Sequence, residues 1–189
     1  MRRNIFTGGN QMPLFSAFEI LAETLVPSGI LPPSAPNPFV IQGYWVQLSL
    51  APGTTQANFN ITFKETTDFN QGAGQSALQA QIVDPSGVVQ PYKYFFASVG
   101  RGFLNQSLFS GQTVIYGVQA LPGLPTDAAL PQGGTGWRGT VSIDGQTPGS
   151  LIATPTRRLL YTSGSDITKA TALDAVVYAV PTFSGAARI

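Results

Sequence analysis

Side chains alternate between apolar and polar along residues 39–64, with one interruption at residues 51–55. A period of two residues is typical of a β-strand with one buried and one solvent-facing row. The apolar row consists of Tyr44, Val46, Leu48 and Leu50 before the interruption and of Phe59, Ile61 and Phe63 after it. The interruption, Ala51-Pro52-Gly53-Thr54-Thr55, is rich in turn-forming residues. We therefore predict two strands joined as a β-hairpin.

Shorter stretches of the same alternation recur along the chain, separated by turn signals. Asp84-Pro85-Ser86-Gly87 has the residues of a type I turn at their favoured positions, and Asp144-Gly145 is a second hairpin signal. Residues 88–99 are predicted as a strand rich in aromatic residues, in which Pro91 indicates an edge position or a bulge. Leu173–Val180 is predicted as the last strand.

The segment from Pro13 to Val26 has two interpretations. A helix would align Leu14, Phe18, Leu21 and Leu25 on one stripe, whereas a strand would place Glu19 and Glu23 on a solvent-facing row. Two glutamates four residues apart repel on a helix face, which favours the strand. The five prolines within residues 27–38 predict an extended connector.

These patterns predict an all-β protein. Roughly eight to ten short strands without a βαβ rhythm indicate an antiparallel β-sandwich, jelly-roll or immunoglobulin-like, with at most one short N-terminal helix. A length of 189 residues favours a single domain. We assign residues 1–12 to a flexible N-terminal arm, 13–181 to the β-sandwich domain and 182–189 to a C-terminal tail, which should fray unless a partner or the domain's own sheet edge captures it.

The composition limits the chemistry that is available. There is no cysteine and no histidine, which excludes disulfides, Ser–His and Cys–His dyads, and metal sites built on either residue. A net charge of +1 provides no broad field for nucleic acid or anionic lipid. No apolar run reaches the length of a membrane span, and Glu19 and Glu23 interrupt the stretch after Arg2 and Arg3, which makes a poor signal-peptide core. The sequence does not indicate the cellular compartment of the protein.

Weak ligand-binding candidates lie in the loops and at one strand start. Asp68 and Asn70 offer oxygen ligands within residues 66–76, but two alternate positions do not make a calcium site. Asp127 lies in the loop at 121–136, and Trp137 with Arg138 follows it directly. An exposed tryptophan face could stack on a sugar, so we take Trp137 as the better ligand candidate; Trp45, which has the parity of Gln47 and Ser49, is predicted on the polar face.

The sequence leaves two hypotheses for function. Only 10% of residues are charged, and both ends carry arm-like segments, which favours a non-catalytic structural protein that forms homo-oligomers or part of a larger particle or surface layer. The alternative is a binding module for carbohydrate or another neutral ligand, with its site in the loops at 66–76 and 121–137. We expect no catalytic residues, metal or cofactor in either case, no nucleic acid as partner and no membrane span.

Overall fold

A computed structural model describes residues 14–27, 29–66, 78–96, 101–120 and 137–189. The predicted N-terminal arm at 1–12 lies outside these residues, as do most of the two candidate ligand-binding loops. The fold within them is all-β, with one short 3₁₀ helix. The elements are β1 (Leu14–Thr24), β2 (Phe39–Leu50), β3 (Gln56–Glu65), β4 (Leu78–Val83), β5 (Val89–Pro91), η2 (Lys93–Phe96), β6 (Gly102–Phe109), β7 (Thr113–Ala120), β8 (Trp137–Asp144), β9 (Leu151–Thr162) and β10 (Ala172–Ala179).

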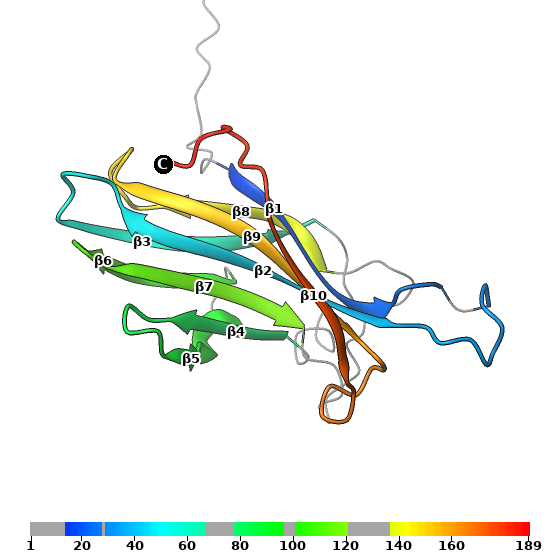
Figure 1. The fold of residues 1–189 in the computed structure, drawn as a ribbon. Helices are drawn as coiled ribbons and strands as arrows, with labels where there is room; N and C mark the ends of the chain where they lie inside the picture. Colours follow the sequence, from blue (N-terminus) through cyan, green and yellow to red (C-terminus); the bar gives the residue numbers. More distant parts are fainter. Residues whose placement is uncertain (1–13, 28, 67–77, 97–100, 121–136) are drawn as a thin grey trace, which may run out of the picture.

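The strands form one continuous antiparallel sheet that curls into a half-barrel (Figure 1). The order along the main path is β5-β4-β7-β2-β1-β8-β3-β6, with β9 on the other edge of β2 and β10 outside β9. Strand β1 holds the two halves together, because residues 14–20 pair with β8 and residues 21–24 pair with β2. The all-β, antiparallel prediction is confirmed. Two separate sheets of a sandwich are not confirmed, since hydrogen bonding continues through β1.

The predicted hairpin at 39–64 is wrong in its pairing. Both strands and the turn at 51–55 are present, but β2 pairs with β1, β7 and β9, whereas β3 pairs with β6 and β8. The turn therefore carries the chain from one half of the curled sheet to the other. The Asp144-Gly145 turn does the same between β8 and β9. Apolar–polar alternation indicates that one face of a strand is buried, but it does not identify the neighbouring strand.

The main core fills the inside of the curl. Ile61 is fully buried in the middle of β3, and the polar row of that strand faces outward, as predicted. Phe18 of β1 contacts the rings of Tyr44, Phe63 and Trp137, which come from both halves of the sheet. The hydroxyls of Ser16 and Tyr44 form a buried hydrogen bond of 2.5 Å. Aromatic packing and this bond fix the two halves against each other.

The structure confirms some of the predictions for the N-terminal segment and the turns, and corrects others. Residues 14–24 form a strand and not a helix. The connector at 27–38 brings the chain back beside the end of β1, since the Leu25 N–H donates to the Pro38 carbonyl. The turn at 84–87 does join β4 to β5, and Pro91 lies in an edge strand as expected. The strand predicted at 88–99 ends at Pro91, and η2 takes its place at Lys93–Phe96; residues 97–99 lie outside the described residues.

The C-terminal tail is held by the sheet's own edge. Leu151 and Ile189 exchange backbone hydrogen bonds of 3.1 and 2.9 Å, and Ala153 donates to Ala187. Arg188 forms a bridge with Ile152, one residue further along β9. The domain's own strand β9 therefore captures residues 187–189.

Candidate functional site

Two of the five predicted ligand-binding residues lie in the described part of the chain. Trp137 and Arg138 are the first two residues of β8. Asp68, Asn70 and Asp127 lie outside the described residues. The two loops predicted to hold a neutral ligand therefore lie almost entirely outside the described residues. Their described residues are Thr66 and, at the start of β8, Trp137.

Trp137 lies in the core, with 1% of its surface exposed. Its ring centre is 4.5 Å from that of Phe18 and 5.9 Å from that of Phe63, which it meets nearly parallel at 17°. Arg101 approaches the same indole, with its guanidinium carbon 5.7 Å from the ring centre. Other side chains thus occupy the ring faces on which a sugar would have to stack. In this structure Trp137 contributes packing.

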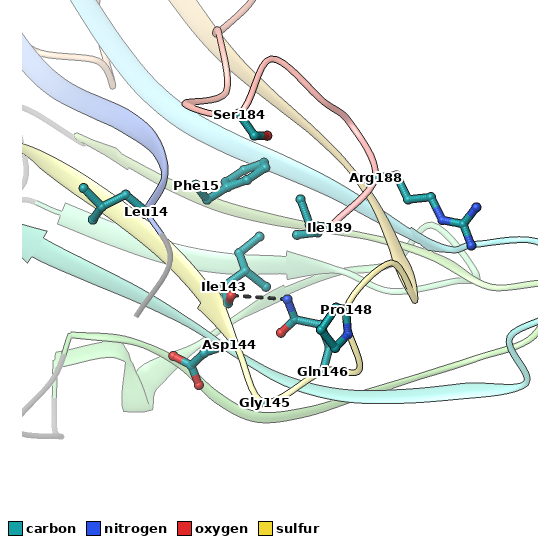
Figure 2. A pocket seen from close by; sticks show the side chains of 10 residues that line it. All are labelled: Leu14, Phe15, Ile143, Asp144, Gly145, Gln146, Pro148, Ser184, Arg188 and Ile189. Atoms are coloured by element: carbon teal, nitrogen blue, oxygen red, sulfur yellow. Dashed lines mark hydrogen bonds between the residues drawn. The ribbon is translucent and has the colours of Figure 1, made fainter. Parts of the chain in front are cut away.

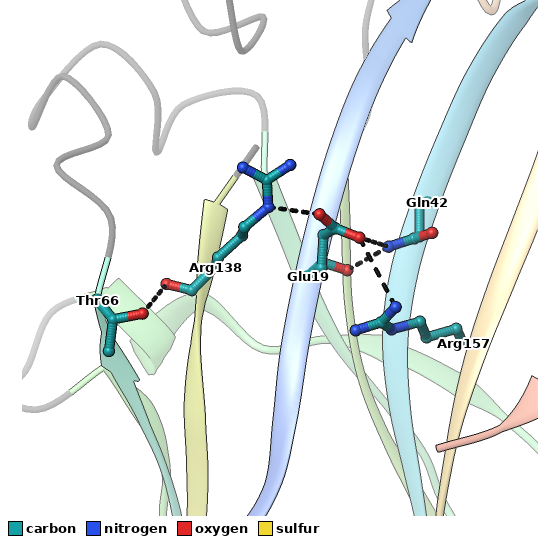
Figure 3. Close-up of polar contacts among 5 residues, drawn as sticks. All are labelled: Glu19, Gln42, Thr66, Arg138 and Arg157. Atoms are coloured by element: carbon teal, nitrogen blue, oxygen red, sulfur yellow. Dashed lines mark hydrogen bonds and ion pairs between the residues drawn. The ribbon is translucent and has the colours of Figure 1, made fainter. Parts of the chain in front are cut away.

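Arg138 belongs to a polar cluster that spans both halves of the sheet (Figure 3). Its Nε donates to Glu19 Oε1 at 2.5 Å, and Gln42 donates to Glu19 Oε2 at 3.1 Å and to the Glu19 carbonyl at 2.9 Å. The Nη1 atom of Arg157 lies 3.7 Å from Glu19 Oε2. A single carboxylate on β1 therefore connects β8 on one side with β2 and β9 on the other.

The environment of Glu19 keeps it ionised. Burial alone would raise the pKa of Glu19, but the hydrogen bonds from Arg138 and Gln42, together with the charges of Arg138 and Arg157, outweigh it and lower the pKa. The prediction that Glu19 faces solvent is wrong, since its side chain is only 22% exposed. Among the described residues, the Glu19 carboxylate contacts two arginines and no second acid, an arrangement that fits a structural role.

Arg157 and Arg158 lie on opposite faces of β9, as strand parity requires. Arg157 reaches Glu19, whereas the guanidinium of Arg158 stacks over the indole of Trp45 at 4.1 Å. Trp45 has the predicted parity but is only 3% exposed, because Arg158 covers its indole and the backbone of Gly117 lies against it. The two arginines therefore do not form a shared anion site.

A largely apolar pocket of about 390 Å³ lies where β1 begins, beside the β8–β9 turn and the C-terminus (Figure 2). Phe15, Ile143 and Ile189 supply apolar walls. Gln146 lies at its lower side, donates its amide N–H to the Ile143 carbonyl at 3.3 Å, and has an amide oxygen that is buried without a partner among the described residues. The pocket thus offers apolar surface with the unpartnered amide oxygen of Gln146 as a hydrogen-bond acceptor, and Asp144, Ser184 and Arg188 also line it.

Strand β10 is the most unusual surface of the described structure. All eight of its residues are exposed although it is rich in apolar side chains, and it hydrogen-bonds to β9 along one edge only. The four large apolar residues are exposed by 41–62%: Leu173, Val176, Val177 and Tyr178. Sequence reasoning identified the strand but not its exposure, since an apolar run of this length usually indicates a buried strand.

Comparison with known proteins assigns no function. No protein-family model matches the chain, and neither a curated protein nor a solved structure matches it significantly. Within the described residues there is no group of three or more acidic side chains placed to hold a metal ion. The part of the chain that the structure covers also has no helix long and apolar enough to span a membrane.

Proposed function

We propose that this chain is a non-catalytic structural protein that assembles with copies of itself, as a homo-oligomer or within a larger particle or surface layer. The observation that carries this proposal is the exposure of β10, in which the large apolar side chains and one row of backbone groups face outward. An edge strand of this kind is a template for pairing with another chain. Large apolar patches on a protein surface mark interaction sites.

The charge distribution supports the same conclusion. A soluble domain usually stays dispersed because it carries charge, and this chain has few charged residues and a net charge of only +1. Asp174 is the single charged residue of β10. Little electrostatic repulsion therefore opposes contact between two copies at this strand.

Sedimentation velocity at micromolar concentration tests the proposal. The wild-type protein should sediment faster than a 19.9 kDa monomer. Val177→Lys should shift the protein toward the monomer, because Val177 is 62% exposed and a lysine adds charge at the interface without disturbing the core. Val88→Lys is the matched control, since Val88 is 53% exposed in the β4–β5 turn. A monomeric wild type would contradict the assembly proposal.

Binding of a neutral ligand is the second candidate, and the pocket of Figure 2 favours it. Its apolar lining and the unpartnered oxygen of Gln146 suit a small apolar molecule with one hydroxyl or amide donor. Octyl glucoside below its micellar concentration combines an alkyl chain with a sugar and should raise the melting temperature. Gln146→Leu should reduce this rise; an unchanged melting temperature in the wild type would argue against the pocket.

A further inference from the structure

We propose that two copies of the chain join edge to edge through β10, antiparallel and around a two-fold axis at Val176. This inference rests on the proposed assembly function and specifies its interface. It follows from three features of β10: the lack of edge protection, the direction of its free backbone groups and the placement of its only charged side chain.

The three edges of the curled sheet differ in protection. Proteins guard exposed edges with short strands, prolines, bulges or charges. Strand β5 is three residues long and contains Pro91, and β6 is interrupted opposite Asn60, where Asn105 has a φ of 55°. Strand β10 has neither a proline nor a bulge after Asp174. It is therefore the edge of the described sheet that best accepts another regular strand.

The backbone of β10 presents its free groups in a regular row. Val180 donates its N–H to the Pro155 carbonyl of β9 at 2.9 Å, and residues 174–180 run without a register shift. Backbone groups alternate along a strand, so those of Val176 and Tyr178 also face β9, while those of Ala175, Val177 and Ala179 face outward. In agreement, the Ala175 N–H bonds to Asp174 Oδ1 at 2.8 Å and not to β9. A second strand is the partner that satisfies such a row.

Symmetry and charge select the register. A two-fold axis places one residue opposite itself, and the choice of that residue decides what faces Asp174. With Val176 at the axis, Asp174 faces the partner's Tyr178, whose hydroxyl is a hydrogen-bond donor on the same face of the strand. An axis at Val177 would set the carboxylate against an apolar side chain, and one at Asp174 would bring two carboxylates together. Of these three registers, only the one with its axis at Val176 pairs the charge with a donor.

In this register the outward backbone groups of the two copies also form hydrogen bonds with each other. Ala175 pairs with the partner's Val177, so the Ala175 N–H leaves the Asp174 carboxylate for a backbone carbonyl of the second copy. The carboxylate then accepts from the partner's Tyr178. Each polar group that is capped locally in the single chain gains a partner in the pair. The outward apolar side chains of Leu173 and Val177 extend the contact beside the backbone ladder.

Disulfide trapping tests the register directly, because the chain has no cysteine. Val176 opposite itself is a non-hydrogen-bonded pair, with Cα atoms about 4.5 Å apart, within the range that a disulfide spans. Val176→Cys should therefore form a covalent dimer under mild oxidation. It should do so at least about ten-fold faster than Val88→Cys, since pairing raises the local thiol concentration.

A mixture of Ala175→Cys and Val177→Cys proteins provides an independent check. It should give the mixed disulfide in preference to either homodimer, because these residues face each other in the proposed register. Preferential Val177→Cys homodimers would overturn the Val176 axis. A wild type that oligomerises while Val176→Cys cross-links no faster than Val88→Cys would overturn pairing through β10 and leave the assembly proposal standing. A monomeric wild type overturns both.

The contact between Asp174 and the partner's Tyr178 has its own test. Tyr178→Phe should weaken self-association about ten-fold, since symmetry removes two hydrogen bonds, each worth roughly a factor of three. Tyr94→Phe removes a hydroxyl from another exposed tyrosine and should leave the association constant unchanged. Equal effects of the two variants in sedimentation equilibrium would contradict the register.

Discussion

The indole of Trp45 occupies the space that any side chain at Gly117 would need. The two residues face each other across the β2–β7 pair, and a Cβ atom on Gly117 would lie 2.0 Å from Trp45 Cε3. Arg158 stacks over the same indole. The large ring is thus held between a bare backbone and a guanidinium, on the face of β2 opposite the main core.

Gly117→Ala should lower the free energy of unfolding by roughly 1–3 kcal/mol, because the indole has to move out of a packed position. Gly164→Ala is the control, since a Cβ atom added at Gly164 would have no atom within 4 Å and the backbone there is not left-handed. Urea unfolding should show a change within about 0.5 kcal/mol for the control. Equal losses at both glycines would contradict the role assigned to Trp45.

Ile61 and Thr62 test the register of β3 in the same way. Ile61→Asn should cost roughly 3–6 kcal/mol, from lost apolar burial and from a buried amide without partners. Thr62→Asn should cost about 0.5 kcal/mol or less, because this side chain lies on the outward row. Chemical denaturation of the two variants decides the point, and similar midpoints would mean that β3 is buried on both faces.

The sequence predicted which side chains are buried better than it predicted which strands pair with each other. Alternation located β2 and β3 and the buried row with Ile61, since a period of two depends only on which face meets the core. It predicted them as a hairpin, although the turn at 51–55 crosses between the two halves of the sheet. The pattern along a strand is the same whether the next strand lies beside it or across the core, so pairing could not follow from it.

The candidate site shows the same limit. Strand parity, a local property, suffices to place Arg157 and Arg158 on opposite faces of β9, where the structure has them. Neither the burial of Trp137 nor the exposure of β10 could be predicted, since both depend on strand order. The polar cluster around Glu19 draws its residues from four strands, β1, β2, β8 and β9, and no spacing in the sequence would reveal it.

The free energy of unfolding should fall above about pH 10, for reasons that lie in the core. Burial raises the pKa of Tyr44 and, more than the nearby Tyr92 does, that of Tyr116. Both phenols stay protonated in the folded state, while the unfolded chain releases their protons near pH 10. Proton release on unfolding therefore favours the unfolded state as the pH rises.

Replacing either tyrosine measures this contribution. Tyr44→Phe and Tyr116→Phe should each make the alkaline loss shallower, by up to about 1.4 kcal/mol per pH unit, in urea unfolding between pH 8 and 11.5. Tyr44→Phe also removes the hydrogen bond to Ser16, which lowers the curve by a constant amount without changing its slope. Slopes that match the wild type would show that these phenols are not the groups responsible.

At acid pH the controlling group should be Glu19. Burial opposes its ionisation, but Arg138, Gln42 and Arg157 lower its pKa below the ordinary value of 4.5. A carboxyl whose folded pKa is lowered contributes stability above its unfolded pKa and loses it as the pH falls through the folded pKa. Glu19→Gln should therefore cost about 1–2 kcal/mol at pH 7, a range reduced for partial solvent exposure.

This difference between Glu19→Gln and the wild type should shrink steadily as the pH falls below about 4.5, because the wild-type carboxyl then becomes neutral as well. Glu23→Gln, one residue before β1 ends, is the matched control and should differ little from the wild type at pH 7. Urea midpoints measured from pH 7 to pH 3 distinguish the cases. A cost at Glu19 that stays constant over this range would mean that side-chain packing, and not charge, joins β1 to β8 and β9.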